Sequence, residues 1–75
     1  MNLPEVLIHV NDNPNESEKN DLVEQLRELD GVIAPRFSQE KDHLLFVSYN
    51  SDTINATKLL DKVKESGFKA QLVGL

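Results

Sequence analysis

The sequence of 75 residues contains no cysteine, no long apolar run and no cluster of basic residues. Without cysteine the chain has no disulfide, no thiolate metal site and no cysteine nucleophile, so packing alone must stabilise its fold. A membrane span needs about 18 or more consecutive apolar residues, and the N-terminal segment lacks the basic region of a signal peptide. We therefore expect a cytoplasmic protein that does not enter the membrane.

The charge balance excludes one class of partner. Eight Lys and Arg residues stand against 13 Asp and Glu residues, which gives a formal net charge of -5. Such a chain is repelled by the phosphate backbone of DNA and RNA, since nucleic-acid binding relies on clustered positive charge. We expect no nucleic-acid partner.

Hydrophobic periodicity predicts two helices and four strands in a single domain over residues 1–75. Alternation of apolar and polar residues predicts strands over residues 5–10, 32–38, 43–49 and 68–75, the middle two joined by a hairpin loop. Apolar side chains at helical spacing predict helices from about residue 16 to 30 and from about 56 to 66. Asn15 and Asn55 are suitable N-caps, and Gly31 and Gly67 are suitable C-terminal stops.

The order strand, helix, strand, strand, helix, strand is typical of one fold class. It predicts an α+β, ferredoxin-like sandwich with a four-stranded antiparallel sheet, strand order 4-1-3-2, and both helices on one face. Pro35 has no N–H to donate, so the strand that contains it should lie at an edge, as this order requires. The predicted core comprises Ile8, Val10, Leu22, Leu26, Leu29, Val32, Phe37, Leu45, Val47, Leu59, Val63, Phe68, Ala70 and Leu72.

Three segments resemble the heavy-metal-associated domain, the module of copper chaperones and of the N-terminal arms of metal-pumping P-type ATPases. They are "LRELDGV" (residues 26–32), "VSYN" (47–50) and "LLDKVKESGFKAQLV" (59–73). The resemblance covers nearly the whole chain. It implies the same fold and an association with metal-handling systems.

The chain departs from this family at the metal site. The family carries a Met-x-Cys-x-x-Cys loop between its first strand and first helix, and the aligned positions here are Asn13, Asn15 and Glu18. Cu(I) needs thiolate or thioether ligands, whereas amide and carboxylate oxygens prefer Mg²⁺, Ca²⁺ or Mn²⁺. We therefore predict a degenerate metal site that holds neither copper nor a cofactor.

The stretch "VNDNPNESEKND" (residues 10–21) has two interpretations. Acidic residues are favoured beside the positive end of a helix, so the stretch is explained as a well-capped first helical turn. Alternatively, carboxylates of the loop from Asp12 to Glu18, with or without His9, bind a hard or borderline cation weakly. A Ca²⁺ loop needs a glycine at its sharp turn and none is present, which favours the first interpretation.

The histidines and the remaining polar residues suggest no joint chemistry. By strand alternation His9 shares a face with Leu7, while His43 shares one with Leu45 and Val47. The two rings are therefore expected to point apart, which disfavours joint metal ligation. The sequence also lacks a Ser-His-Asp arrangement, a glycine-rich phosphate loop and a nucleophile elbow, so we predict no enzyme.

The sheet face that the helices leave open is more apolar than a solvated face. Contiguous apolar residues on a surface mark partner contacts, although a small domain with imperfect patterning would look the same. We predict a noncatalytic interaction or regulatory module that binds a protein partner or itself through this face. The alternatives are a weak cation binder and a dimer that senses a small molecule between its two chains. The predicted contact residues are Leu7, His9, Leu44, Phe46 and Val73, beside Ser48, Gln71 and Arg36.

Overall fold

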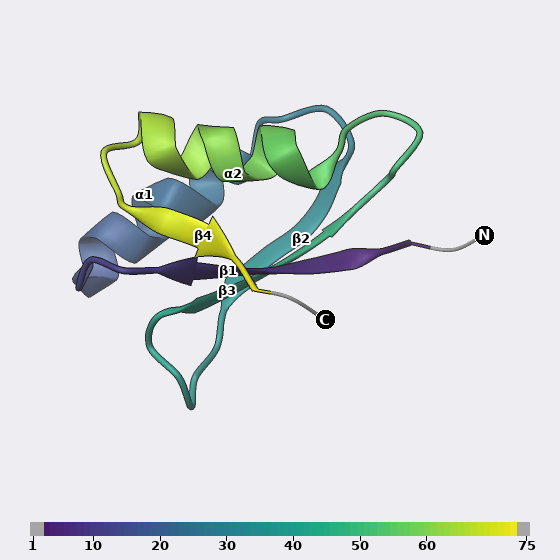
Figure 1. The fold of residues 1–75 in the computed structure, drawn as a ribbon. Helices are drawn as coiled ribbons and strands as arrows, with labels where there is room; N and C mark the ends of the chain where they lie inside the picture. The colour runs from purple at the N-terminus through teal and green to yellow at the C-terminus, as the bar shows by residue number, and fades with distance from the viewer. Residues whose placement is uncertain (1–2, 74–75) are drawn as a thin grey trace.

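The computed structural model describes residues 3–73, and the six predicted elements occur in the expected order (Figure 1). The predicted domain over residues 1–75 and the predicted fourth strand both extend beyond the described residues, the strand by Gly74 and Leu75. The elements are β1 (Glu5–Val10), α1 (Glu16–Arg27), β2 (Val32–Phe37), β3 (Leu44–Tyr49), α2 (Ala56–Glu65) and β4 (Ala70–Leu72).

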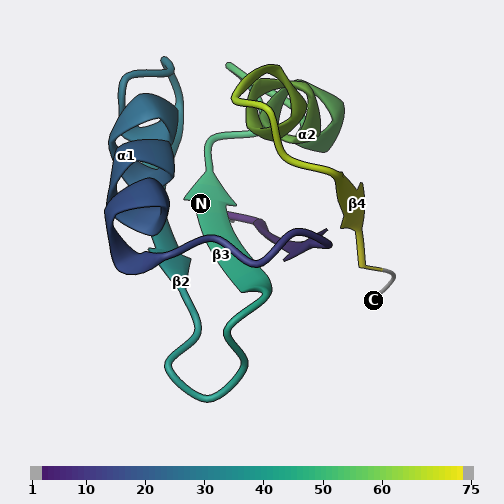
Figure 2. The same cartoon turned by 90° about the vertical axis from the view of Figure 1, so that its left-hand side faces the viewer.

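The sheet confirms the predicted fold class. Its strand order is β2-β3-β1-β4, which is 4-1-3-2 counted from the other edge, and every pairing is antiparallel. Figure 2 shows both helices on the same side of this sheet. Pro35 lies in β2 opposite Val47, so the strand with the missing N–H is an edge strand as predicted.

The core lies between the sheet and the two helices. Two of the predictions for it were wrong: Leu72 is 39% exposed, and Val6, which was left out, is 8% exposed. Leu72 lies in the short edge strand β4, where only one neighbouring strand shields it, whereas Val6 lies in the central strand β1. The buried residues of the hydrophobic core cluster are Val6, Ile8, Val10, Leu22, Leu26, Leu45, Val47, Leu59, Val63 and Ala70.

The first helix is shorter than predicted, since α1 ends at Arg27 instead of Asp30. The N–H of Leu29 donates to the carbonyl of Leu26 at 3.0 Å, three residues back, which tightens the last turn and ends the α-helical ladder. Neither helix within residues 3–73 has the length and apolar character that crossing a membrane requires.

Candidate functional site

The loop between β1 and α1 and the first turn of α1 hold Asn13, Asn15 and Glu18, the three positions predicted to align with the Met, Cys and Cys of the heavy-metal-associated domain. Asn15 is the N-cap of α1, and its side-chain oxygen accepts a hydrogen bond from the N–H of Glu18 at 2.8 Å. In return Glu18 accepts from the N–H of Asn15 at 3.0 Å. This reciprocal pair is a capping box, so Asn15 and Glu18 satisfy backbone donors of the helix. Asn13 is exposed.

Asp12 fastens the same loop to the segment before β4. Its carboxylate accepts a hydrogen bond from the N–H of Lys69 at 2.8 Å, and the N–H of Asn11 donates to the carbonyl of Lys69 at 2.7 Å. In the part of the chain that the structure describes, no three His, Cys, Asp or Glu side chains are grouped closely enough to hold a metal ion. The geometry therefore favours the structural interpretation of this acidic stretch.

The two histidines lie against each other, and the prediction that their rings point apart was wrong. The ring centroids are 5.8 Å apart and the ring planes are inclined by 24°. His43 lies in the turn before β3, so the alternation of a strand does not set its direction. Its Nδ1 instead donates to the carbonyl oxygens of Val10 at 3.1 Å and Asp12 at 3.0 Å. No local sequence signal predicts this, because it depends on how the hairpin meets β1.

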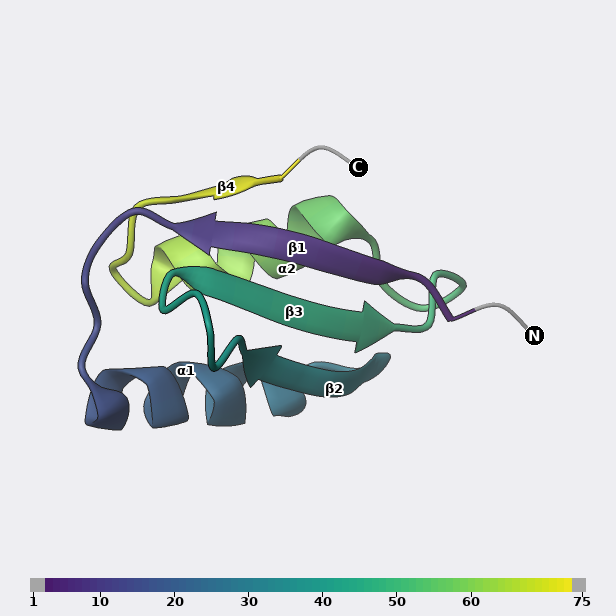
Figure 3. The same cartoon turned by 90° about the horizontal axis from the view of Figure 1, so that it is seen from below.

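Figure 3 shows the open face of the sheet in front of the helices. By the alternation of burial along β1 and β3, the predicted contact residues of these strands lie on this face. The strand register sets Leu7 opposite Phe46 and His9 opposite Leu44. The N–H of Val73 donates to the carbonyl of Leu7 at 2.9 Å, which adds Val73 beside them. These five side chains are half-buried. We call them the open-face patch.

A polar network that the sequence analysis missed borders this patch. Glu5 lies on the same face as Leu7, and its carboxylate accepts from Arg36 at 3.1 Å and from the Ser48 hydroxyl at 3.3 Å. The Arg36 guanidinium also lies 4.8 Å from the centre of the Phe46 ring, in cation–π contact. The alternation of residues 5, 7 and 9 was the signal that could have placed Glu5 here.

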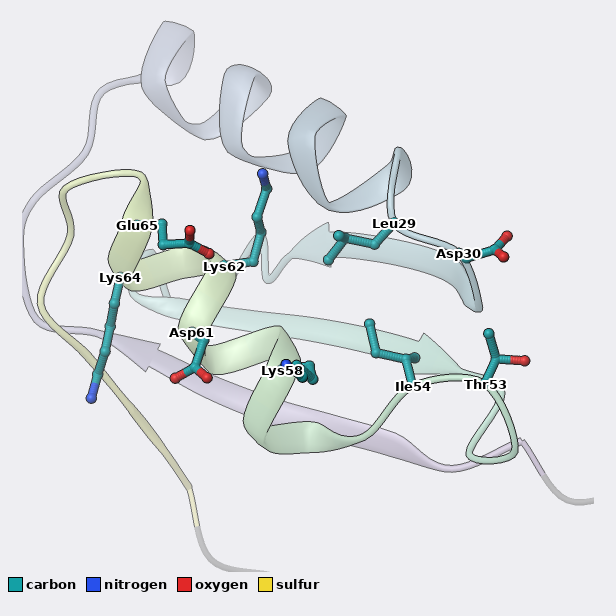
Figure 4. A pocket seen from close by; sticks show the side chains of 9 residues that line it. All are labelled: Leu29, Asp30, Thr53, Ile54, Lys58, Asp61, Lys62, Lys64 and Glu65. Atoms are coloured by element: carbon teal, nitrogen blue, oxygen red, sulfur yellow. The ribbon is translucent and has the colours of Figure 1, made fainter.

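A second surface feature lies on the opposite side of the molecule, between α2 and the end of α1. It is a groove of about 820 Å³ in which Leu29 and Ile54 point toward each other (Figure 4). Its charged lining residues are of both signs. The lining residues are Leu29, Asp30, Thr53, Ile54, Lys58, Asp61, Lys62, Lys64 and Glu65.

Solved structures share this fold. The N-terminal domain of a potential copper-translocating P-type ATPase from Bacillus subtilis matches with a TM-score of 0.84 at 17% identity, over 95% of this chain and 88% of that one. A yeast copper transporter domain matches with a TM-score of 0.82 at 23% identity, over 93% and 94% of the two chains. Oxidised MerP from Ralstonia metallidurans gives 0.82 at 13% identity, over 95% and 97%.

Comparison of the sequence itself gives nothing further: no family model and no curated protein matches it. The structural matches confirm the expected resemblance at the level of the fold. Because their identities are low, they establish the fold and leave the activity to be argued from the residues of this chain.

Proposed function

We propose that this chain is a noncatalytic interaction or regulatory module, linked to metal handling, that binds a protein partner through the open face of its sheet. The observation that carries the proposal is the open-face patch on the central strands β1 and β3. Both helices lie on the other face, so the patch is left to solvent and to a partner. Contiguous apolar surface of this kind is typical of contact sites.

The link to metal handling is supported by the fold relatives, which are described as a copper-translocating ATPase domain and a copper transporter domain. We do not propose that this chain carries Cu(I), because the sequence has no cysteine and oxygen ligands bind soft ions poorly. A role in binding a protein of a metal-handling system, rather than in transferring the metal, fits both the fold relatives and the lack of cysteine. The proposed location is the cytoplasm, whose reducing conditions permit a fold that packing alone stabilises.

The charge of the chain favours a partner of a particular kind. Two copies would each carry a formal net charge of -5 and would repel one another as they approached. A partner with net positive charge and an apolar contact surface would instead be attracted over a distance of about 10 Å at moderate salt. We therefore favour a basic protein partner over self-association.

Affinity isolation with matched variants tests this proposal. The baits are the wild-type chain, Phe46→Ser in the patch, and Ile33→Ser as the control. Ile33 is 50% exposed and lies on the edge strand β2, so its replacement removes apolar surface outside the patch. Proteins that the baits retain are then purified and their affinities measured.

The supporting result is a basic partner that binds the wild type and Ile33→Ser alike and binds Phe46→Ser at least tenfold more weakly. A partner that binds Phe46→Ser as tightly as the wild type contradicts the proposal. Sedimentation of the wild-type chain alone tests whether the patch instead binds a second copy of this chain. If the wild type is a dimer and Phe46→Ser is a monomer, the patch is a dimer interface and the proposal of a basic partner is wrong.

A further inference from the structure

The only two histidines of the chain, His9 and His43, come together at the end of β1. His9 belongs to the open face, and His43 reaches the same place from the turn before β3. Both side chains are half-buried, so water and small ions have access to the pair. The function proposed above makes no use of their ring nitrogens.

Hydrogen bonds assign the same nitrogen of each ring as the donor. Nδ1 of His43 faces two backbone carbonyl oxygens, which only accept, so this nitrogen carries the proton. Nδ1 of His9 lies 2.7 Å from the side-chain oxygen Oδ1 of Asn11, which also accepts. In the neutral ring the free lone pair is then on Nε2. Metal-binding histidines have this arrangement, with the second nitrogen donating to a carbonyl oxygen that orients the ring.

The distance between the rings suits a shared ion. A zinc–nitrogen bond is about 2.0–2.1 Å and each nitrogen is roughly 1 Å from its ring centre, so the centroids of two imidazoles on one ion lie about 5 Å apart at a tetrahedral angle and about 6.2 Å apart at most, when the two bonds are collinear. The observed separation is 5.8 Å. Binding one ion requires both Nε2 lone pairs to point at it, so the near-parallel rings, whose planes are inclined by 24°, must turn about their Cβ–Cγ bonds on binding, a torsion with broad energy wells.

We infer that His9 and His43 form a two-imidazole site for a borderline divalent cation such as Zn²⁺, Ni²⁺ or Cu²⁺. Water completes the coordination, because no third His, Cys, Asp or Glu side chain within residues 3–73 joins the pair. Imidazole suits these ions, whereas Cu(I) prefers sulfur and Mg²⁺ prefers oxygen. Asn11 is the positioning residue that orients the His9 ring.

Titration with Zn²⁺, followed by calorimetry and by the NMR signals of the two imidazole rings, tests this site. We expect one equivalent to shift both rings together, and an equal concentration of Mg²⁺ to leave them unchanged. His9→Gln should weaken Zn²⁺ binding at least tenfold, since it removes a ligand. Asn11→Ala should weaken it by about tenfold, as loss of an orienting partner does. Glu28→Gln, an exposed change at the C-terminal end of α1, is the control and should have no effect.

The inference is overturned if His9→Gln leaves the Zn²⁺ affinity within twofold of wild type, or if the shifts centre on the carboxylates of residues 12–18. His43→Gln also loses the hydrogen bonds to the carbonyl oxygens of Val10 and Asp12, so the thermal unfolding of this variant is measured together with its Zn²⁺ affinity. The decisive variant is therefore His9→Gln. Phe46→Ser should bind Zn²⁺ as the wild type does. Failure of this site and failure of the partner surface are therefore separate results.

Discussion

At the scale of single residues, Gly31 and Gly67 illustrate two reasons for which a position requires glycine: a positive φ, and a lack of space for a Cβ atom. Both follow a helix and both have a positive φ, +94° and +98°, which side-chain-bearing residues adopt at a cost. A Cβ on Gly31 would lie 2.9 Å from the Cβ of Thr53, whereas a Cβ on Gly67 would meet nothing within 4 Å. The carbonyl of Gly31 also accepts from the N–H of Asn50 at 2.7 Å, which holds the turn against the loop before α2.

Replacing each glycine by alanine should therefore give unequal losses of stability. Gly67→Ala adds only the backbone strain of a positive φ, about 1–2 kcal/mol. Gly31→Ala adds the same strain together with overpacking against Thr53, a further ~1–3 kcal/mol. Urea unfolding of the two variants measures the difference. Equal losses would show that the contact between Gly31 and Thr53 is absent in solution.

At the scale of the elements, the central strands β1 and β3 divide the molecule into a buried side and an open side. Val6, Ile8 and Val10 of β1 face the helices, and the residues between them face outward. On the helix side α1 contributes Leu22 and Leu26, which are 1% and 0% exposed. Along β1, alternate residues therefore either pack in the core beneath the helices or lie on the open face.

Two substitutions test this division. Leu26→Ala leaves a cavity between α1 and the sheet and should cost about 2–5 kcal/mol of unfolding free energy. Phe46→Ser removes a half-buried ring from the open face and should cost at least about 1 kcal/mol less, because solvent fills the space. Chemical denaturation compares the two. If Phe46→Ser is as costly as Leu26→Ala, the open-face patch belongs to the core and the assignment of its face is wrong.

The elements were predictable from the sequence because their signals are local. Asn15 followed by Glu18 marked the start of α1, and Pro35 marked β2 as an edge strand, both of which the structure confirms. The failures have non-local causes. The direction of the His43 ring depends on carbonyl groups of β1 and its loop, and the exposure of Leu72 depends on the absence of a neighbour beyond β4 among the described residues.

At the scale of the whole molecule, the chain shares its fold with solved copper-binding domains, and its own residues have a structural role at the loop between β1 and α1. Asn15 and Glu18 form the capping box of α1, and the sequence contains no cysteine. The helix face offers a groove with charges of both signs, and the open face offers apolar side chains bordered by Glu5 and Arg36. Of these surfaces, the open face is the one whose chemistry suits a protein contact.

The most direct test of this account maps the partner on the chain. The protein isolated with the wild-type bait is added to the ¹⁵N-labelled chain, and backbone and methyl NMR signals are followed. The account predicts shifts over β1, β3 and the end of β4, largest at Leu7, Leu44 and Phe46, with the groove between the helices unchanged. Shifts confined to that groove or to the loop of residues 11–15 would contradict it.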